Sequence, residues 1–211
     1  EKIKKENESK NNKVKRKKQK MGGGILDDEQ KKFIETIKAL DESDLKDPTQ
    51  WPWRDKTNGY IKTLRKLVGH FPIVLSVATA VVLDDSMRIL LERRSDDSKW
   101  SIPGGTVGPG ESVKECIVGD ISRETSLDAE IEDLHLFDEL SGTPHYYPNG
   151  DIISSIKIIY VAKHCTGELK PNYENLELEY FDLQDIPENV SGSTRKIVAS
   201  LISRFDEVKN W

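Results

Sequence analysis

The chain has 211 residues, of which 36% are hydrophobic and 33% are charged, and its formal net charge at pH 7 is −5. This length fits one well-filled domain with an extension, and excludes two ordinary domains with separate cores. The longest mostly apolar run, residues 71–83, has the length of a strand and contains Ser76 and Thr79, which excludes a bilayer-spanning segment there.

The first twenty residues are strongly basic. They hold ten Lys or Arg and three Glu, a net charge of +7, so the remainder carries −5 − 7 = −12. We expect residues 1–24 to form a disordered tail, because few apolar side chains offset the entropy cost of ordering. A polyanion-binding segment or an import signal is the alternative. The acidic remainder argues against nucleic acid as the main ligand of the domain.

A helical arm is predicted for residues 25–69. Apolar side chains recur at helical spacing in two stretches of it, at Phe33, Ile34, Ile37 and Leu40 and again at Tyr60, Ile61, Leu64, Leu67 and Val68. Pro48 and Pro52, together with Trp51 and Trp53, mark a packed connector. We expect this arm to dock on the domain that follows. A homodimer formed through the arm is the alternative.

Residues 70–211 predict a mixed α/β domain. Runs rich in β-branched and apolar residues predict strands at residues 73–83, 87–92, 156–162 and 178–183. Helices are predicted at residues 112–125 and along an amphipathic face at Ile197, Val198, Leu201, Ile202 and Phe205. This order of strands and helices, with hairpins between strands, predicts an α/β sandwich.

The cysteines indicate the compartment. Cys116 and Cys165 match no metal-binding or disulfide framework, and no apolar signal segment lies near residue 1. We therefore expect a cytoplasmic protein. The histidines, His70, His135, His145 and His164, have no ligand spacing, so we assign none of them a role.

A glycine-rich loop at residues 103–111 leads into the predicted helix at 112–125. Asp120 and Glu124 are four residues apart and therefore lie on one face of that helix, with Arg123 beside them. Carboxylate oxygens and a backbone carbonyl are ligands that magnesium accepts. The alternative is a solvated helix with a simple Asp120–Arg123 pair.

Residues 104–127, GGTVGPGESVKECIVGDISRETSL, resemble a Nudix box, and the spacing matches without a gap. Gly105, Glu111 and Glu124 stand at positions that the family pattern requires. Flanking segments extend the resemblance to about residues 58–190. The resemblance implies a MutT-like Nudix fold, an α/β/α sandwich with a mixed sheet. It also implies a pyrophosphohydrolase that cleaves a nucleoside diphosphate linked to another moiety.

Several positions of the box depart from the family pattern. Gly119 replaces an arginine, Asp120 a glutamate, Arg123 the first of two paired glutamates, and Ser126 a glycine. Arg123 changes the local charge by two units, and one unit-charge interaction is worth about 4 kcal/mol at 4 Å and an effective dielectric constant of 20. We therefore expect no site for several metals. A catalytically inactive Nudix-fold nucleotide-binding or regulatory module is the alternative.

The resemblance also implies roles for individual residues. Glu111, Asp120 and Glu124 are the expected catalytic carboxylates, with Glu111 orienting the site or acting as a base. The Gly104 carbonyl, Asp120 and Glu124 are the expected ligands of Mg²⁺, with Mn²⁺ as the alternative. On the substrate side we expect phosphate contacts from Arg93, Arg94 and Arg123, base stacking by Tyr146 or Tyr147, and a further carboxylate from Glu174.

Overall fold

The computed structural model describes residues 28, 31, 32, 35, 39, 60–142, 144–147 and 149–211. The predicted basic tail, the first predicted helix and the proline-rich connector lie outside these residues, apart from the isolated positions named. The chain divides into two compact units. The first comprises Glu1–Ile73, Gly108–Gly110 and Pro144–Ser154, and the second comprises Val74–Val107, Glu111–Thr143 and Ser155–Trp211.

In the first unit, the second helix of the predicted arm is confirmed as α3 (Tyr60–Val68). Arg65 of α3 donates to the carbonyls of Gly69, Phe71 and Ile152 at 3.0, 2.7 and 2.9 Å. One guanidinium therefore satisfies carbonyls from the end of the helix and from the start of β8. The short strand β7 (His145–Tyr146) pairs with that same stretch of β8 in antiparallel orientation.

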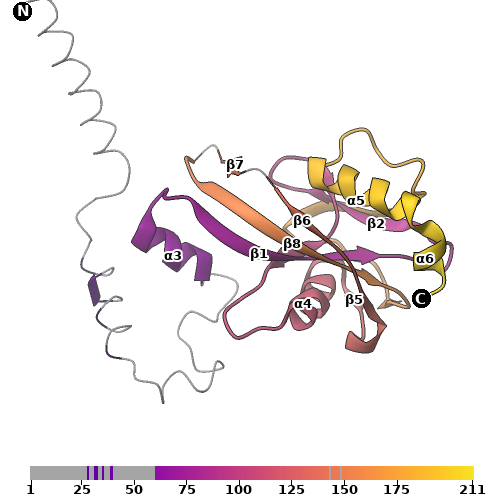
Figure 1. The fold of residues 1–211 in the computed structure, drawn as a ribbon, viewed down its shortest axis with the longest axis horizontal. Coiled ribbons are helices and arrows are strands. Elements are labelled where there is room, and N and C mark those ends of the chain that lie inside the picture. Colours follow the sequence, from indigo (N-terminus) through magenta and orange to yellow (C-terminus); the bar gives the residue numbers. More distant parts are fainter. Residues whose placement is uncertain are drawn as a thin grey trace, which may run out of the picture. The chain divides into compact units, whose positions relative to one another are not determined.

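The strands of the second unit form three sheets (Figure 1). The largest has the order β4-β1-β8-β6, with bounds Gly104–Thr106, Ile73–Val82, Ile152–Ala162 and Leu134–Ser141. The second has the order β10-β2-β3, with bounds Asn175–Phe181, Ile89–Arg94 and Trp100–Ser101. The third pairs β5 (Leu127–Asp128) with β9 (Thr166–Gly167).

The largest sheet is mixed, as predicted. The Leu83 N–H donates to the Ala162 carbonyl at 3.0 Å, so the C-terminal ends of β1 and β8 meet and these neighbours run parallel. By contrast, β4 is antiparallel to β1, and β6 is antiparallel to β8.

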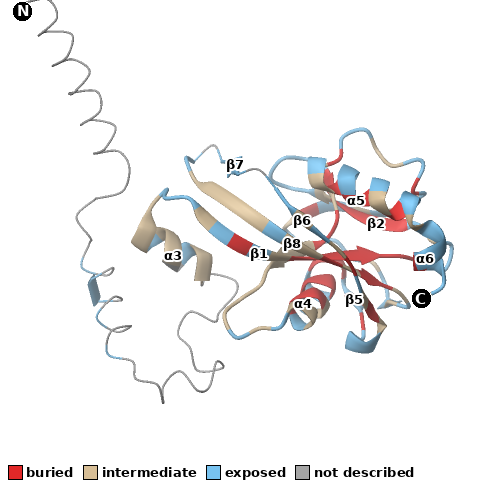
Figure 2. Cartoon of the chain, viewed as in Figure 1, coloured by how far each residue is buried: buried red, intermediate tan, exposed pale blue. Residues whose placement is uncertain are grey.

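Two apolar layers lie on opposite faces of the strands. Along β1 the side chains alternate, since Val81 packs in a cluster with α5 (Gly192–Ser203) whereas Ala80 and Val82 pack in a cluster with α4 (Val113–Thr125). Figure 1 shows α4 and α5 on the two sides of these strands, and Figure 2 shows buried residues on the surfaces that face each other. The predicted α/β/α sandwich is confirmed.

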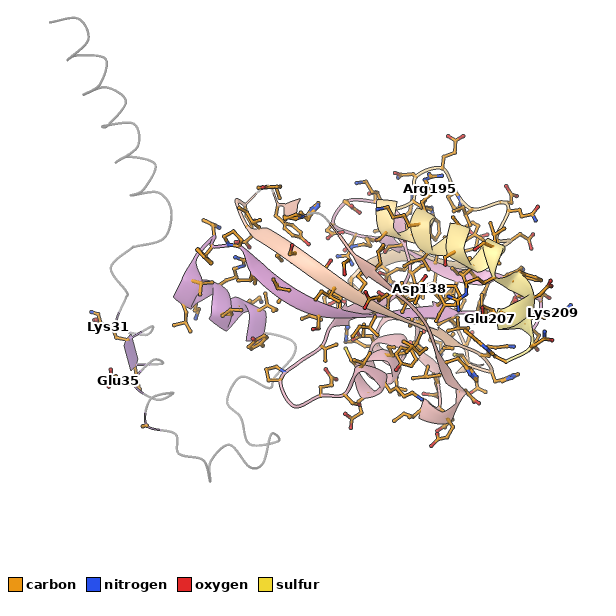
Figure 3. The ribbon with its side chains drawn as sticks, viewed as in Figure 1. Lys31, Glu35, Asp138, Arg195, Glu207 and Lys209 are labelled. Carbon is orange, nitrogen blue, oxygen red and sulfur yellow. The ribbon has the colours of Figure 1, made fainter. Side chains whose placement is uncertain are left out.

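The chain ends in two helices rather than one. The predicted closing helix is interrupted at Arg204, which separates α5 from α6 (Phe205–Lys209). Arg204 donates to the Phe137 carbonyl at 2.8 Å, and Ser200 Oγ donates to Asp138 Oδ2 at 3.0 Å. Asp138 and Glu207, which pairs with Arg204, are labelled in Figure 3. These bonds hold the C-terminal helices against β6.

The remaining boundaries differ from prediction by a few residues. β8 begins at Ile152 rather than 156, and β10 begins at Asn175 rather than 178. The strands β3 to β7 and β9 and the 3₁₀ helix Ile131–Asp133 were not predicted. Among the described residues, no helix combines the length and the apolar character that crossing a bilayer requires.

Helix α4 has well-defined ends. Ser112 caps its start, and a reciprocal bond from the Ser112 N–H to Glu115 completes a capping box. At its other end Ser126 has φ +63°, the left-handed conformation that glycine adopts most easily. The serine therefore occupies a strained backbone position where the family pattern has glycine.

Replacing this serine is expected to stabilise the protein. Ser126→Gly should raise the free energy of unfolding by about 1 kcal/mol, because glycine has no Cβ to oppose φ +63°. Ser122→Gly is the matched control, since Ser122 lies within the same helix and its change should lower that free energy by about 0.5–1 kcal/mol. Urea unfolding measures both. Equal destabilisation by the two changes would contradict the assignment of strain.

Candidate active site

Two glycines bring the loop and helix α4 together. Gly104 and Gly105 pair with Thr79 and Ala78 of β1. A Cβ on Gly104, which has φ +152°, would lie 2.3 Å from the Ala78 carbonyl oxygen, and a Cβ on Gly105 would lie 2.6 Å from Asp120 Oδ2. A Cβ would therefore collide with backbone at position 104 and would push the Asp120 carboxylate aside at position 105, so the loop backbone lies directly against that carboxylate.

Helix α4 turns two carboxylates inward, as the spacing predicts. Asp120 and Glu124 are only 3% and 5% exposed. Glu124 Oε2 accepts a hydrogen bond of 3.0 Å from the Gly104 N–H, and Asp120 Oδ2 lies 3.4 Å from Cys116 Sγ. The alternative of a solvated helix face is therefore wrong for these two side chains, although the Asp120–Arg123 pair that it included is present at 2.6 Å.

Arg123 joins three carboxylates. Its Nη2 lies 2.6 Å from Asp120 Oδ1 and 2.8 Å from Glu124 Oε1, and its Nη1 lies 2.7 Å from Glu174 Oε2. Burial opposes the charge of the guanidinium, but the hydrogen bond to Asp120 and the charges of the carboxylates outweigh it and raise the pKa of Arg123. The group is a fixed cation.

A third buried carboxylate, Glu92 on β2, escaped the sequence analysis. Glu92 is 3% exposed, and it accepts from Ser101 Oγ at 3.3 Å and from Asn175 Nδ2 at 3.4 Å. It lies two residues after Leu90, which packs against α4, so alternation along the strand turns Glu92 toward the same face. An acid that alternates onto the same face of a strand as core residues could have indicated this buried position in the sequence.

These carboxylates act on one another. Burial raises the pKa of Glu92. Burial also raises the pKa of Glu124 to about 8, assisted by the charges of Glu92 and Asp120 and opposed by Arg123 and the Gly104 N–H. The site therefore gathers several acids in a poorly solvated space, where burial favours the neutral form of Glu124 and the charge of Arg123 favours its ionised form.

An asparagine-rich turn fixes Glu174 beside the helix. Asn172 Nδ2 donates to the Arg123 carbonyl, and Asn175 Nδ2 donates to the Glu124 carbonyl, both at 2.7 Å. Within the turn, the Glu174 N–H donates to Asn172 Oδ1 at 2.7 Å. Carbonyls at the end of α4 thus find their partners in residues 172–175. Glu174 was predicted on the substrate side, and the structure brings it to Arg123.

The two arginines of β2 differ in position. Arg94 forms two bonds with Asp96 at 2.9 and 2.7 Å and lies 3.8 Å from Glu92, which places it beside the cluster. Arg93 instead pairs with Glu177 of β10 at 3.0 Å. Arg94 therefore lies beside Glu92, and the phosphate contacts of both arginines stay predictions.

Three further predicted site residues, Glu111, Tyr146 and Tyr147, lie outside helix α4 and the turn at residues 172–175. Glu111 is half-buried and precedes the cap of α4 by one residue. Tyr146 belongs to β7 in the first unit and is 71% exposed. Tyr147, also in that unit, packs against the ring of His145 with centroids 4.4 Å apart. The roles of these residues stay predictions.

The expected metal ligands Asp120 and Glu124 are both in contact with Arg123. In the part of the chain that the structure describes, no group of three or more His, Cys, Asp or Glu is arranged to hold a metal ion. Nη2 of Arg123 lies within hydrogen-bond distance of both Asp120 and Glu124, the side chains that the resemblance gives to magnesium. With these contacts in place, the residues do not fit a divalent ion.

Comparison with known proteins identifies the family. The sequence pattern of the NUDIX domain matches residues 74–201, which is more than half of the chain. The chain belongs to the NUDIX family. This NUDIX domain contains the glycine loop, α4 and the three carboxylates that Arg123 contacts.

The NUDIX domain resembles both curated proteins and solved structures. An ADP-ribose pyrophosphatase of Methanocaldococcus jannaschii is 31% identical over 109 residues, which are 51% of this chain and 61% of that protein. A putative 8-oxo-dGTP diphosphatase of Bacillus subtilis is 44% identical over 54 residues, 26% of this chain and 36% of that protein. The chain therefore matches less than two thirds of either relative.

A solved structure supports the fold. The crystal structure of a MutT NUDIX hydrolase from Burkholderia pseudomallei superimposes with a TM-score of 0.54 at 23% identity, covering 61% of this chain and 98% of that one. Its nearly complete coverage shows that the NUDIX fold as a whole is present in this chain.

The glycine at the start of β4 is expected to be essential for stability. Gly104→Ala should lower the free energy of unfolding by about 1–3 kcal/mol, because the added Cβ meets backbone that no rotamer change can clear. Gly192→Ala is the control, since a Cβ there meets nothing within 4 Å and the residue begins a helix. Chemical denaturation followed by circular dichroism compares them. A Gly104→Ala protein as stable as the control would refute the proposed close approach.

Proposed function

We propose that this NUDIX protein is a pyrophosphohydrolase that cleaves a nucleoside diphosphate linked to another moiety. The observation that carries the proposal is the contact of the glycine loop with two buried carboxylates. The Gly104 N–H donates to Glu124, and Gly105 lies against Asp120. Family membership supports it, as do the names of the relatives, an ADP-ribose pyrophosphatase and a putative 8-oxo-dGTP diphosphatase.

The proposed reaction is attack of water on a phosphorus atom of the diphosphate. A bond forms from the water oxygen to phosphorus, and the bond from phosphorus to the bridging oxygen breaks. Glu111, Asp120 and Glu124 are the proposed catalytic carboxylates, which orient the water and take its proton. Burial raises the pKa of Glu124, and a carboxylate with a raised pKa is a stronger proton acceptor.

Positive side chains would receive the phosphate oxygens. Arg123 keeps 37% of its side chain exposed, and Arg94 keeps 45%. Planar guanidinium groups bind phosphate through paired hydrogen bonds. Arg93, Tyr146 and Glu174 complete the proposed substrate side, with base stacking assigned to Tyr146 or Tyr147.

Mg²⁺, or Mn²⁺ in its place, is the cofactor that the family resemblance implies, with Gly104, Asp120 and Glu124 as ligands. Such an ion would neutralise the diphosphate and acidify the attacking water. Because Arg123 contacts both carboxylates in the structure, we assign no step of the reaction to a metal.

A second candidate function is nucleotide binding without turnover. The observation that favours it is the set of three ion pairs made by Arg123, which engages carboxylates that catalysis would need. A cytoplasmic location and the absence of a nucleic-acid ligand for the domain are further predictions from the sequence. A homodimer through the N-terminal arm stays the alternative to docking of the arm on the domain.

Turnover tests the two candidates directly. The purified chain is incubated with ADP-ribose, dinucleotides and nucleoside triphosphates, with and without Mg²⁺ or Mn²⁺, and products are separated by chromatography. Arg123→Glu is assayed in parallel, with Arg195→Glu on the exposed part of α5 as a control of equal charge change. We expect the native chain and the control to hydrolyse at least one diphosphate derivative. Activity confined to Arg123→Glu would favour the binding function, and no activity in any protein would overturn the proposed hydrolase.

A variant of Glu124 tests the assigned catalytic role. Glu124→Gln should lower kcat about 100-fold, because the amide cannot take a proton. Glu130→Gln is the matched control, since Glu130 is an exposed residue that precedes a 3₁₀ helix and makes no side-chain cap. Steady-state kinetics on the best substrate measures both. A loss below threefold at Glu124 would remove it from the catalytic set.

A further inference from the structure

The guanidinium of Arg123 contacts all three members of the carboxylate cluster formed by Asp120, Glu124 and Glu174. Nη2 of Arg123 contacts Asp120 Oδ1 and Glu124 Oε1 at 2.6 and 2.8 Å. The same guanidinium reaches Glu174 through Nη1 at 2.7 Å. A single positive group thus binds three acids from two separate segments, helix α4 and the turn at residues 172–175.

The cluster needs a positive charge. Asp120, Glu124 and the adjacent Glu92 are each at most 5% exposed, and ionised carboxylates at such burial are strongly unfavourable unless they are paired. Arg94 lies 3.8 Å from Glu92 but directs its two close hydrogen bonds to Asp96. The cation in direct contact with Asp120 and Glu124 is Arg123.

Arg123 is also anchored through its backbone. Its carbonyl accepts from Asn172 Nδ2 at 2.7 Å, and Asn172 in turn fixes the Glu174 N–H. Turning the side chain outward would break three ion pairs at once and leave two buried acids without their cation. The contact is therefore a stable part of the fold, not a chance orientation of a surface arginine.

We propose that the Arg123 guanidinium is the resident cation of this cluster, so that the free protein has no divalent-metal site until Arg123 is replaced. The Arg123 guanidinium and a divalent metal ion would have the same effect, since each brings positive charge to the oxygens of Asp120 and Glu124. They cannot do so together, because Nη2 already lies at hydrogen-bond distance from both. The inference concerns the site of the proposed function but does not depend on turnover.

Titration with Mn²⁺ tests the proposal without substrate. The free-ion signal in electron paramagnetic resonance reports binding to the native chain, to Arg123→Glu and to the control Arg195→Glu. We expect Arg123→Glu to bind Mn²⁺ at least tenfold more tightly than the native chain, and the control to match the native chain. Asp120→Asn added to Arg123→Glu should abolish the gain, which locates the ion. Equal affinity in the native chain and Arg123→Glu would overturn the proposal.

Thermal unfolding gives a second readout. The unfolding temperature of Arg123→Glu should fall in EDTA and recover with Mn²⁺, whereas that of the native chain should be the same in both. If Arg123→Glu fails to fold under either condition, Arg123→Met replaces it, since methionine keeps similar length without charge. A methionine variant that binds Mn²⁺ no more tightly than the native chain also overturns the proposal. If the chain hydrolyses no substrate, the proposed function fails but the inference about Arg123 does not. The two can therefore fail independently.

Discussion

The ion pairs of Arg123 are the interaction on which the arrangement of the site depends. Asp120 and Glu124 are buried against a glycine loop that leaves no room for other side chains, and Glu92 adds a third acid from β2. Burial of this much negative charge is tolerable only beside a cation. Arg123 supplies that charge from within the same helix, and through Glu174 it ties the helix to the turn at residues 172–175.

Elements with a strong periodic pattern were predictable from the sequence. The strand that became β1 and the helix that became α4 carry alternation and helical spacing over many residues, and both were placed within about one residue of their observed bounds. The strands β3, β4 and β5 are two or three residues long and owe their existence to neighbours in the sheet. No local pattern marks so short a strand.

Only the part of the site that lies on one helix was predictable from the sequence. Asp120, Arg123 and Glu124 share one helix, so spacing alone brings them to one face. Glu92 lies on β2 and Glu124 on α4, and sequence spacing does not show that these two elements meet. The position of Glu92 two residues after the apolar Leu90 did indicate that its side chain faces the core. The asparagines at 172 and 175 bind backbone carbonyls of α4, and such long-range capping leaves no periodic trace.

The partial exposure of Glu174 has a consequence for how this site would take an anion. Among the three acids held by Arg123 it has the most accessible side chain, 39% against 4% and 7% for Asp120 and Glu124. A phosphate group arriving from solvent meets a guanidinium that already makes three ion pairs, and the carboxylate it displaces at least cost is Glu174. Binding of a phosphate ligand would then exchange the Glu174 carboxylate for phosphate on Arg123. Selectivity would depend on how much more strongly the phosphate accepts hydrogen bonds than the carboxylate does.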